Sequence, residues 1–493
     1  MADGTSPSLN WTGFVGLLLL PPALFSWIQF SGPYLGGVDP YYHIKVSQIY
    51  AERGIVKSFP WTQFSIHRDH FGDKEFLFHV GMIPFLRGNV IQGAKLYAVL
   101  LATMCMGVFL LILYAQRVPW PMFWLLLCWS CGPFFLYRLA VVRPQIGGIT
   151  LALLSFFAVI ERRPWLLFIV CVAYPLTYCA PHVAFLIAVI HAAVTYLREG
   201  RFATKQIIVA AAGLSLGFFL HPHFPAIVRV WYVQNVNVLS HIVANTPGLN
   251  LGAELGPPSA DVFIKECPLL LLVCLSIVFF AVLRGRRFTV EALTALVVGA
   301  GFLGLTCLSK RLAEYSVPFL TLFAGLAYSS LADDLRSARP RLRTVIAAIA
   351  FALGLGLAGV SAARTRAVIA GTGVRSLKPA ALWLRANSDP GDVVFTSNWD
   401  EFPELFFYNT TNYYLVALDP TFMLAHDRRI FETWVALRSG ERKDLFDQAQ
   451  NTFHARYVLI AASFTALADL AYADPRLQEV FVDKACAIFE LLP

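Results

Sequence analysis

Long apolar windows that almost lack charge recur along the first 364 residues of this 493-residue chain. Each is roughly 18–22 residues long, the length that an α-helix needs to cross about 30 Å of hydrocarbon. A very apolar soluble core would not repeat such windows all along this part of the chain. The pattern predicts a polytopic α-helical membrane protein with about 11 transmembrane helices, at 11–30, 89–114, 120–137, 147–160, 164–180, 182–197, 206–222, 267–284, 290–308, 312–331 and 342–362.

The polar joints between these windows indicate an orientation. Five of them are basic, namely QRVPW (116–120), ERR (161–163), REGRFATK (198–205), RGRR (284–287) and DDLRSARPRLR (333–343). Short loops rich in Lys and Arg stay on the cytoplasmic side, and all five do so if the N-terminus is cytoplasmic. We therefore expect a multi-pass protein of the inner (cell) membrane, with extracytoplasmic loops at 31–88 and 221–266.

The last part of the chain changes in character. From 365 to 493 it is charged, and strand-like runs such as DVVFTSNW and ARYVLIAA alternate with helical runs such as SLKPAALWLRANS. Short strands that alternate with amphipathic helices are typical of a small α/β domain. The sequence thus predicts a transmembrane domain at 1–364, and a C-terminal α/β domain at 365–493 that the odd number of helices places outside the cytoplasm.

Composition narrows the class of protein. Hydrophobic residues make up 57% of the chain and charged residues only 14%, where a soluble domain carries about a quarter. The net charge of +8 comes from the basic joints, so it indicates membrane orientation and no nucleic-acid partner. Eight of the nine cysteines lie in or beside apolar windows, which favours small core hydrophobes over a disulfide framework or a zinc site.

Titratable residues gather in the loops assigned to the outer side, where such groups near a bilayer tend to mark function. Asp39 follows two glycines and precedes Pro40, so we expect its backbone at a turn close to the membrane surface. An amphipathic helix over KVSQIYAERG (45–54) would follow along the interface. The other outer candidates are Asp73, Glu75, Arg143, His221, His223, Glu254, Lys310 and Arg311.

Each of these residues also has a purely structural interpretation. Arg143 and Arg311 suit side chains that extend to the lipid headgroups. His221 and His223 are also typical of residues that cap a helix end, and Asp73 and Glu75 are typical of solvated charges in a loop. The residue types and their positions alone do not decide between these structural interpretations and a functional role.

Together the outer residues suit one chemistry. A lipid-linked anionic donor places its phosphate at headgroup level, and transfer from it requires positive charge or a metal at the leaving phosphate. A carboxylate must bind or deprotonate the acceptor. Asp39 and Glu254 supply carboxylates, and Arg311, Lys310 or Arg143 supplies the charge, which fits a glycosyl transfer.

Four stretches, in order along the chain, are GGVDPYYHIKVSQ, LGAELGPPS, SKRLAEYSVPFLTLFAGLA and ALWLRANSDPGDVVFTSNWDEFPELFFYN. In this order they resemble motifs of the GT-C superfamily of membrane glycosyltransferases, and within it the oligosaccharyltransferase catalytic subunits. The resemblance implies a GT-C fold and a polyprenyl-phosphate or polyprenyl-diphosphate sugar donor. It also implies a protein or glycan acceptor, membrane lipids as surroundings, and an outward-facing active site.

The resemblance also assigns roles to residues. Asp39 matches the first catalytic aspartate, a ligand of the metal or of the acceptor, and Glu254 matches the glutamate of the external loop. Arg311, with Lys310 beside it and Arg143, would hold the donor phosphate, while Trp399 and Asp400 would bind the acceptor. The divalent cation would be Mg or Mn. The family's second acidic pair is absent from VVRPQ (141–145), so Asp73, Glu75, His221 and His223 are the further metal-ligand candidates.

Other functions remain open. The stretch DKEFLFHVGMIPF is similar to the first loop of the protein O-mannosyltransferase and aminoarabinose transferase group, which would imply monosaccharide transfer. A polytopic lipid or solute transporter would also carry charges among apolar helices, although transporters usually show repeats, and none is visible here. A non-catalytic scaffold whose outer domain binds a partner is the third alternative.

Overall fold

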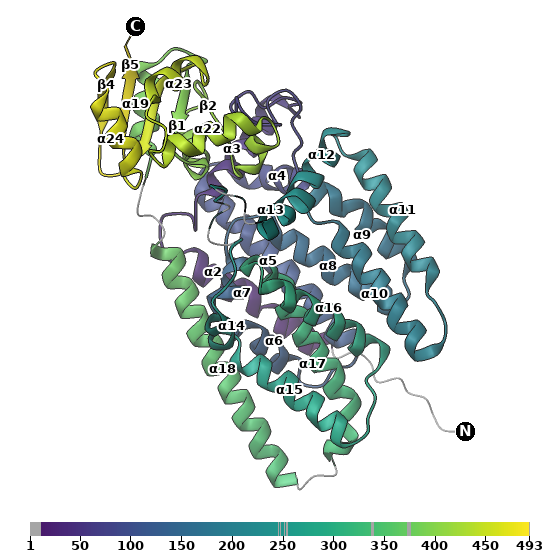
Figure 1. Ribbon diagram of the computed structural model, residues 1–493. Helices are drawn as coiled ribbons and strands as arrows, with labels where there is room; N and C mark the ends of the chain where they lie inside the picture. The colour runs from purple at the N-terminus through teal and green to yellow at the C-terminus, as the bar shows by residue number, and fades with distance from the viewer. Residues whose placement is uncertain are drawn as a thin grey trace. The chain divides into compact units, whose positions relative to one another are not determined.

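A computed structural model describes residues 11–492 of the chain, apart from Asn245, Pro247, Leu251, Ala253, Glu254, 337–339 and 372–375. Helices dominate it (Figure 1). The chain packs into two compact units, each built from three segments. The first unit comprises Met1–Pro33, Lys95–Gly217 and Gly252–Ala370, and the second comprises Tyr34–Ala94, Phe218–Leu251 and Gly371–Pro493. The expected domain boundary at 364/365 stays a prediction.

The first unit is a bundle of apolar helices, and each predicted window corresponds to one helix or to a pair of helices. They are α1 (Trp11–Leu18), α2 (Leu20–Gln29), α5 (Val90–Ala115), α6 (Pro121–Trp129), α7 (Gly132–Ala140), α8 (Gln145–Ile160), α9 (Pro164–Thr177), α10 (His182–Glu199), α11 (Thr204–Leu220), α14 (Ala260–Glu266), α15 (Pro268–Leu283), α16 (Val290–Thr306), η3 (Lys310–Leu312), α17 (Ala313–Arg336) and α18 (Pro340–Gly371).

Four stretches of the described chain are helical, long and apolar enough to cross a membrane, at Thr12–Gln29, Val90–Ala115, His182–Glu199 and Thr344–Gly371. The predicted window 120–137 differs from expectation, because it holds the two helices α6 and α7, bent by 95°. Gly132 has φ of 61° there, and a proline opens α7. Proline cannot continue the preceding hydrogen-bond ladder, so a new helix starts. The count of 11 spans and their orientation stay predictions.

Aromatic side chains fill the core of this bundle, among them Phe109, Phe156 and Phe319, each 0% exposed. Helix α16 packs along α17 at a position where Gly299 has no side chain; a Cβ there would lie 2.9 Å from the Leu320 backbone nitrogen. The outer face of α15 leaves apolar side chains exposed, as suits contact with lipid rather than water.

The second unit surrounds a five-stranded sheet of order β2-β1-β3-β5-β4, in which β2, β1 and β3 run parallel and β5 pairs antiparallel with β3 and β4. Its elements are α3 (Asp39–Arg53), α4 (Phe76–Met82), η1 (Ile83–Leu86), α12 (Ala226–Tyr232), η2 (Val233–Asn237), α13 (Val238–Ala244), α19 (Lys378–Asn387), β1 (Val393–Thr396), η4 (Trp399–Glu401), α20 (Phe402–Tyr408), β2 (Tyr413–Tyr414), α21 (Thr421–Leu424), α22 (Arg428–Arg438), α23 (Leu445–Asn451), β3 (Ala455–Ala461), α24 (Thr465–Ala473), β4 (Leu477–Val482) and β5 (Cys486–Leu491).

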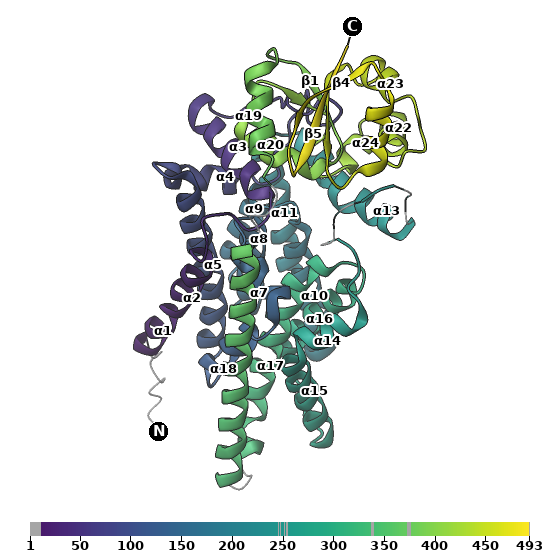
Figure 2. The same ribbon diagram turned by 90° about the vertical axis from the view of Figure 1, so that its left-hand side faces the viewer.

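Successive strand residues face opposite helix layers, because side chains alternate across a strand. Val394 and Leu459 pack towards α19, α20 and α3. Phe395 and Val458, their neighbours, pack towards α22, α23 and α24. Figure 2 shows α19 and α20 on one side of the strands and α22 to α24 on the other. The α/β pattern expected for the tail is therefore present, and α3 from the first loop joins one of its layers.

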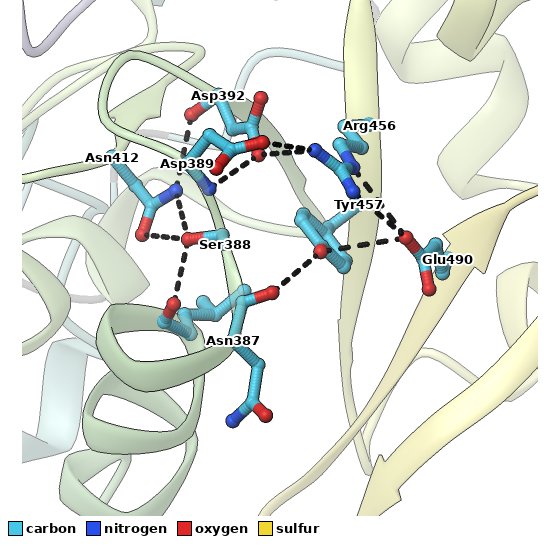
Figure 3. A network of polar contacts seen from close by, with 9 residues as sticks. Asn387, Ser388, Asp389, Asp392, Asn412, Arg456, Tyr457 and Glu490 are labelled. Carbon is cyan, nitrogen blue, oxygen red and sulfur yellow. Dashed lines mark hydrogen bonds and ion pairs between the residues drawn. The ribbon is translucent and has the colours of Figure 1, made fainter.

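A surface network of polar contacts lies at the end of α19 (Figure 3). Arg456 on β3 contacts Asp389 at 2.7 Å and Glu490 on β5 at 3.4 Å, and the Tyr457 hydroxyl donates to the Asn387 carbonyl at 3.0 Å. Exposed ion pairs contribute only about 0–1 kcal/mol each. The network thus orients α19 against the strands, while burial of the two apolar layers supplies most of the stability.

Asp427 caps α22, since its Oδ1 accepts from the backbone nitrogens of Arg429 at 2.7 Å and Ile430 at 3.3 Å. We predict that Asp427→Ala destabilises this unit by about 1 kcal/mol, because two helix N–H groups lose their acceptor. Asp427→Asn keeps a capping oxygen and should unfold close to wild type. Thermal unfolding of the purified full chain checks this, and equal melting of the two variants would contradict the capping role.

Candidate active site

Asp39 lies in the first turn of α3, half-buried. Gly37 has φ of 83° and Pro40 stands at the start of the helix, so the GGVDP stretch makes a turn and then opens a helix directly. The helix thus begins earlier than the 45–54 segment expected from the sequence. An acidic residue in a first turn is favoured by the helix dipole.

One turn further along α3, buried side chains form a hydrogen-bonded chain. His43 Nδ1 lies 2.9 Å from His79 Nε2, and His79 Nδ1 lies 2.8 Å from Asp73 Oδ2. The Tyr50 hydroxyl donates to the same Asp73 oxygen at 2.7 Å. Burial alone would raise the pKa of Asp73, but the His79 contact lowers it below its usual range. Asp73 is therefore a carboxylate that holds His79 in place.

Glu75 joins this chain at its histidine end. The ligand atoms of His43, Glu75 and His79 all lie within 4.8 Å of one another, and all three residues are buried. His43 and His79 are titratable residues of the first loop, but they were not predicted from the sequence to be metal ligands. A signal was present, because Glu75 and His79 stand four residues apart where α4 begins, and Asp39 and His43 four residues apart on α3; residues at this spacing share a helix face.

The two histidines of the HPHFP stretch lie in the same unit but outside this group. His221 Nδ1 accepts from the His223 backbone nitrogen at 3.1 Å, and the His223 ring lies 2.8 Å from the Val56 carbonyl. Both are buried. Their predicted metal-binding role stays a prediction, as does that of Asp39.

The first unit contains a separate buried polar cluster. Arg138 on α7 contacts Glu314 on α17 at 2.8 Å, and the Tyr178 hydroxyl donates to the other Glu314 oxygen at 3.3 Å. Arg311 in turn donates to the Tyr178 oxygen at 2.5 Å. The buried ion pair thus holds Tyr178, and Tyr178 orients Arg311. Arg311 as a whole residue is half-buried.

The other candidates in this unit are Lys310, Arg143 and Glu254. The Lys310 backbone nitrogen, next to Arg311, donates to the Gly256 carbonyl at 3.1 Å. This bond ties the start of η3 to the loop that carries LGAELGPPS. Arg143 lies in the bend before α8, half-buried. Glu254 lies outside the described residues, so its predicted role stays a prediction.

A third group follows strand β1. The Trp399 indole nitrogen donates to the Asn250 carbonyl at 2.9 Å, and Asp400 is exposed beside it. The pKa of Asp400 is raised, mainly by desolvation and to a smaller extent by the charge of Asp39, while the charge of Arg438 acts in the opposite direction. Asp39 and Asp400, distant in sequence, are therefore electrostatic neighbours within the second unit.

Glu401, which the sequence reading missed, lies under this group. Its side chain is 4% exposed, and burial raises its pKa to about 8 although Ser397 donates to it. Arg438 stacks on Trp434, with 4.1 Å from the guanidinium carbon to the ring centre, and donates to Asn398 at 2.9 Å. Glu401 Oε2 and Arg438 Nε have no hydrogen-bond partner among the described residues. The carboxyl end of a parallel strand is a common ligand-binding position.

Comparison with known proteins gives similarity in structure only. No protein-family model and no curated protein sequence matches the chain. The apo oligosaccharyltransferase of Archaeoglobus fulgidus superposes with a TM-score of 0.61 at 13% identity, over 94% of this chain and 72% of that one. ArnT from Cupriavidus metallidurans, bound to undecaprenyl phosphate, gives 0.55 at 14% identity over 98% of both chains. Both are GT-C glycosyltransferases.

The chain has a GT-C fold. Arabinofuranosyltransferase AftD from Mycobacteria matches as well, with a TM-score of 0.57 at 13% identity over 97% of this chain and 40% of AftD. The archaeal oligosaccharyltransferase has also been solved tethered to an acceptor peptide with the sequon NVT, and in complex with Zn and sulfate. The GT-C fold expected from the sequence is thus confirmed.

The buried carboxyl group of Glu401 makes the free energy of unfolding depend on pH. Its pKa rises from 4.5 to about 8 on folding, so the native state holds a proton that the unfolded chain loses. The contribution of Glu401 to stability is then greatest below about pH 4.5 and falls by about 1.4 kcal/mol per pH unit up to about pH 8. We predict that Glu401→Gln flattens this dependence of the melting temperature.

Glu432→Gln is the matched control, since Glu432 is exposed on α22 and pairs with Arg428. It should leave the pH profile unchanged. A wild-type profile in the Glu401→Gln variant would contradict the assignment of a protonated Glu401.

Proposed function

We propose that this protein is a membrane glycosyltransferase that moves a sugar or oligosaccharide from a polyprenyl-phosphate or polyprenyl-diphosphate donor to an acceptor on the outer side of the membrane. The observation that carries the proposal is the GT-C fold with Asp39 in the first turn of α3. The Asp39 carboxylate is half-buried at this helix start and acts electrostatically on Asp400, a proposed acceptor-binding residue. Asp39 would bind or deprotonate the acceptor group.

Arg311 is the proposed donor-phosphate ligand. Its orientation depends on the Tyr178–Glu314–Arg138 chain, and a guanidinium matches the geometry of phosphate oxygens. Lys310 and Arg143 are proposed as further positive groups. Placed at the leaving phosphate, such charge stabilises the transition state because it is already oriented before reaction.

Trp399 and Asp400 are the proposed acceptor-binding residues. They follow β1 at its carboxyl end, and Trp399 is fixed by its bond to the Asn250 carbonyl. The acceptor would be a protein or a glycan, and Glu254 would act with Asp39 on it. A divalent cation belongs to this proposal as well, because the second unit contains nitrogen and oxygen ligands in one buried group.

We predict that Asp39→Asn lowers glycoconjugate formation by at least about 100-fold, without loss of membrane expression. The measurement is mass spectrometry of glycoconjugates from a deletion strain complemented with each variant. Asp69→Asn is the control, since Asp69 is an exposed acid of the same loop and should restore wild-type product. Full product from the Asp39→Asn strain would refute the catalytic role.

The donor side is tested by binding. Arg311→Gln should weaken binding of undecaprenyl phosphate roughly 10–100-fold, because a hydrogen bond to a charged group is lost. Tyr178→Phe should weaken it less, since only the orienting hydroxyl is removed. Native mass spectrometry of the purified chain measures both, with the exposed Arg284→Gln as control. Unchanged binding in Arg311→Gln would place the phosphate elsewhere.

A further inference from the structure

We propose that His43, Glu75 and His79 form a binding site for a zinc-class divalent metal ion. The site lies wholly within the second unit and differs from the acidic metal site that the sequence resemblance implies, because two of its three ligands are imidazoles. The inference goes beyond the proposed reaction, since metal binding is measured directly and does not depend on which sugar or acceptor is used.

The two ring nitrogens already lie close to the separation that a shared ion requires. His43 Nδ1 and His79 Nε2 are 2.9 Å apart, so one proton lies between two ring nitrogens. Tetrahedral zinc with Zn–N bonds of about 2.0–2.1 Å separates two nitrogen ligands by about 3.3 Å. Replacing the shared proton by an ion therefore asks the rings to move apart by less than about half an ångström.

The hydrogen bonds behind His79 select the form of the ring that binds metal. Its Nδ1 donates to the Asp73 carboxylate, which leaves Nε2 with a free electron pair for ligation. A metal-binding histidine commonly donates its other nitrogen to a carboxylate in this way. Asp73 is itself fixed, because Tyr50 donates to one oxygen and the Glu75 backbone nitrogen donates to the other at 3.1 Å.

The third ligand comes from the same short segment. Glu75 directly precedes α4, and the His79 backbone nitrogen donates to the Glu75 carbonyl at 3.0 Å, so one helical turn spaces the two ligands. The side chains of His43, Glu75 and His79 are at most 5% exposed. Such burial keeps the rings from being solvated separately and favours a pre-arranged site over a chance surface cluster.

Donor chemistry decides the class of ion. Mg²⁺ and Mn²⁺ prefer oxygen ligands, whereas imidazole suits Zn²⁺ and its transition-metal relatives. Two imidazoles and one carboxylate are a known catalytic zinc set, and three protein ligands leave a position for water or substrate. The ion expected from the structure is thus Zn²⁺ or Co²⁺, in place of the Mg or Mn expected from the family resemblance.

The experiment is metal analysis of the purified full chain in detergent. After incubation with Zn²⁺ and desalting, we expect about one zinc per chain, and little Mg²⁺ or Mn²⁺ under the same treatment. Binding should weaken as pH falls, because protons compete for the ring nitrogens. Co²⁺-loaded protein should give a visible absorption spectrum that reports the nitrogen ligands.

His43→Ala and His79→Ala should each lose the bound zinc, and Glu75→Gln should weaken it. Asp73→Asn leaves all three ligands in place and should lower zinc affinity by about 10–100-fold, which a purely structural hydrogen-bond chain would not do. His67→Ala is the matched control, since His67 is a buried histidine of the same unit outside the group, and it should keep its zinc.

Gel filtration and thermal unfolding identify any variant that fails to fold, and Glu75→Gln and Asp73→Asn, the mildest changes, then carry the test. No stoichiometric zinc in the wild-type chain would overturn the proposal. Equal zinc in wild type and in the folded ligand variants would overturn it too, as would loss of zinc in His67→Ala alone. Zinc bound at this site in a chain inactive in glycosyl transfer would leave the metal site standing and refute the proposed function instead.

Discussion

The burial of the Asp73 carboxylate is the constraint on which the candidate site around α3 depends. An ionised carboxyl group taken out of water is costly unless it is hydrogen-bonded, and Asp73 is 1% exposed. Tyr50 from α3, His79 from α4 and the Glu75 backbone satisfy it. These bonds fix α3 against α4, and the position of α3 in turn determines where Asp39 stands. One buried charge therefore sets the geometry of the first loop.

A comparable arrangement operates among the apolar helices. Glu314 and Arg138 are buried as an ion pair, and removing one partner of such a pair leaves an uncompensated charge. The pair fixes α7 against α17 and provides the Glu314 oxygen to which Tyr178 donates. Arg311 is then oriented through Tyr178. In both units a buried charge orients a second residue, and that second residue is the one that we propose binds the substrate.

The C-terminal sheet contributes a third element of the same kind. Alternating strand residues pack two helix layers, and the loop after β1 emerges between them with Trp399 and Asp400. Beneath it, Glu401 is buried and protonated near neutral pH. A neutral carboxyl group can be buried at lower cost than a charged one. The proposed acceptor-binding residues Trp399 and Asp400 thus follow a well-packed scaffold, which is what precise positioning of a reacting group requires.

The sequence by itself determined the helices and the α/β character of the tail. Apolar windows must match the thickness of a bilayer, and strand and helix patterns have different periods. Both features can therefore be recognised in short stretches of the sequence. It also singled out Asp39, Asp73 and Glu75. It could not join His43 to His79, which are 36 residues apart, or Arg138 to Glu314, which are 176 apart. Those pairs exist only because the tertiary structure brings their helices together, and desolvation then makes each partner necessary to the other.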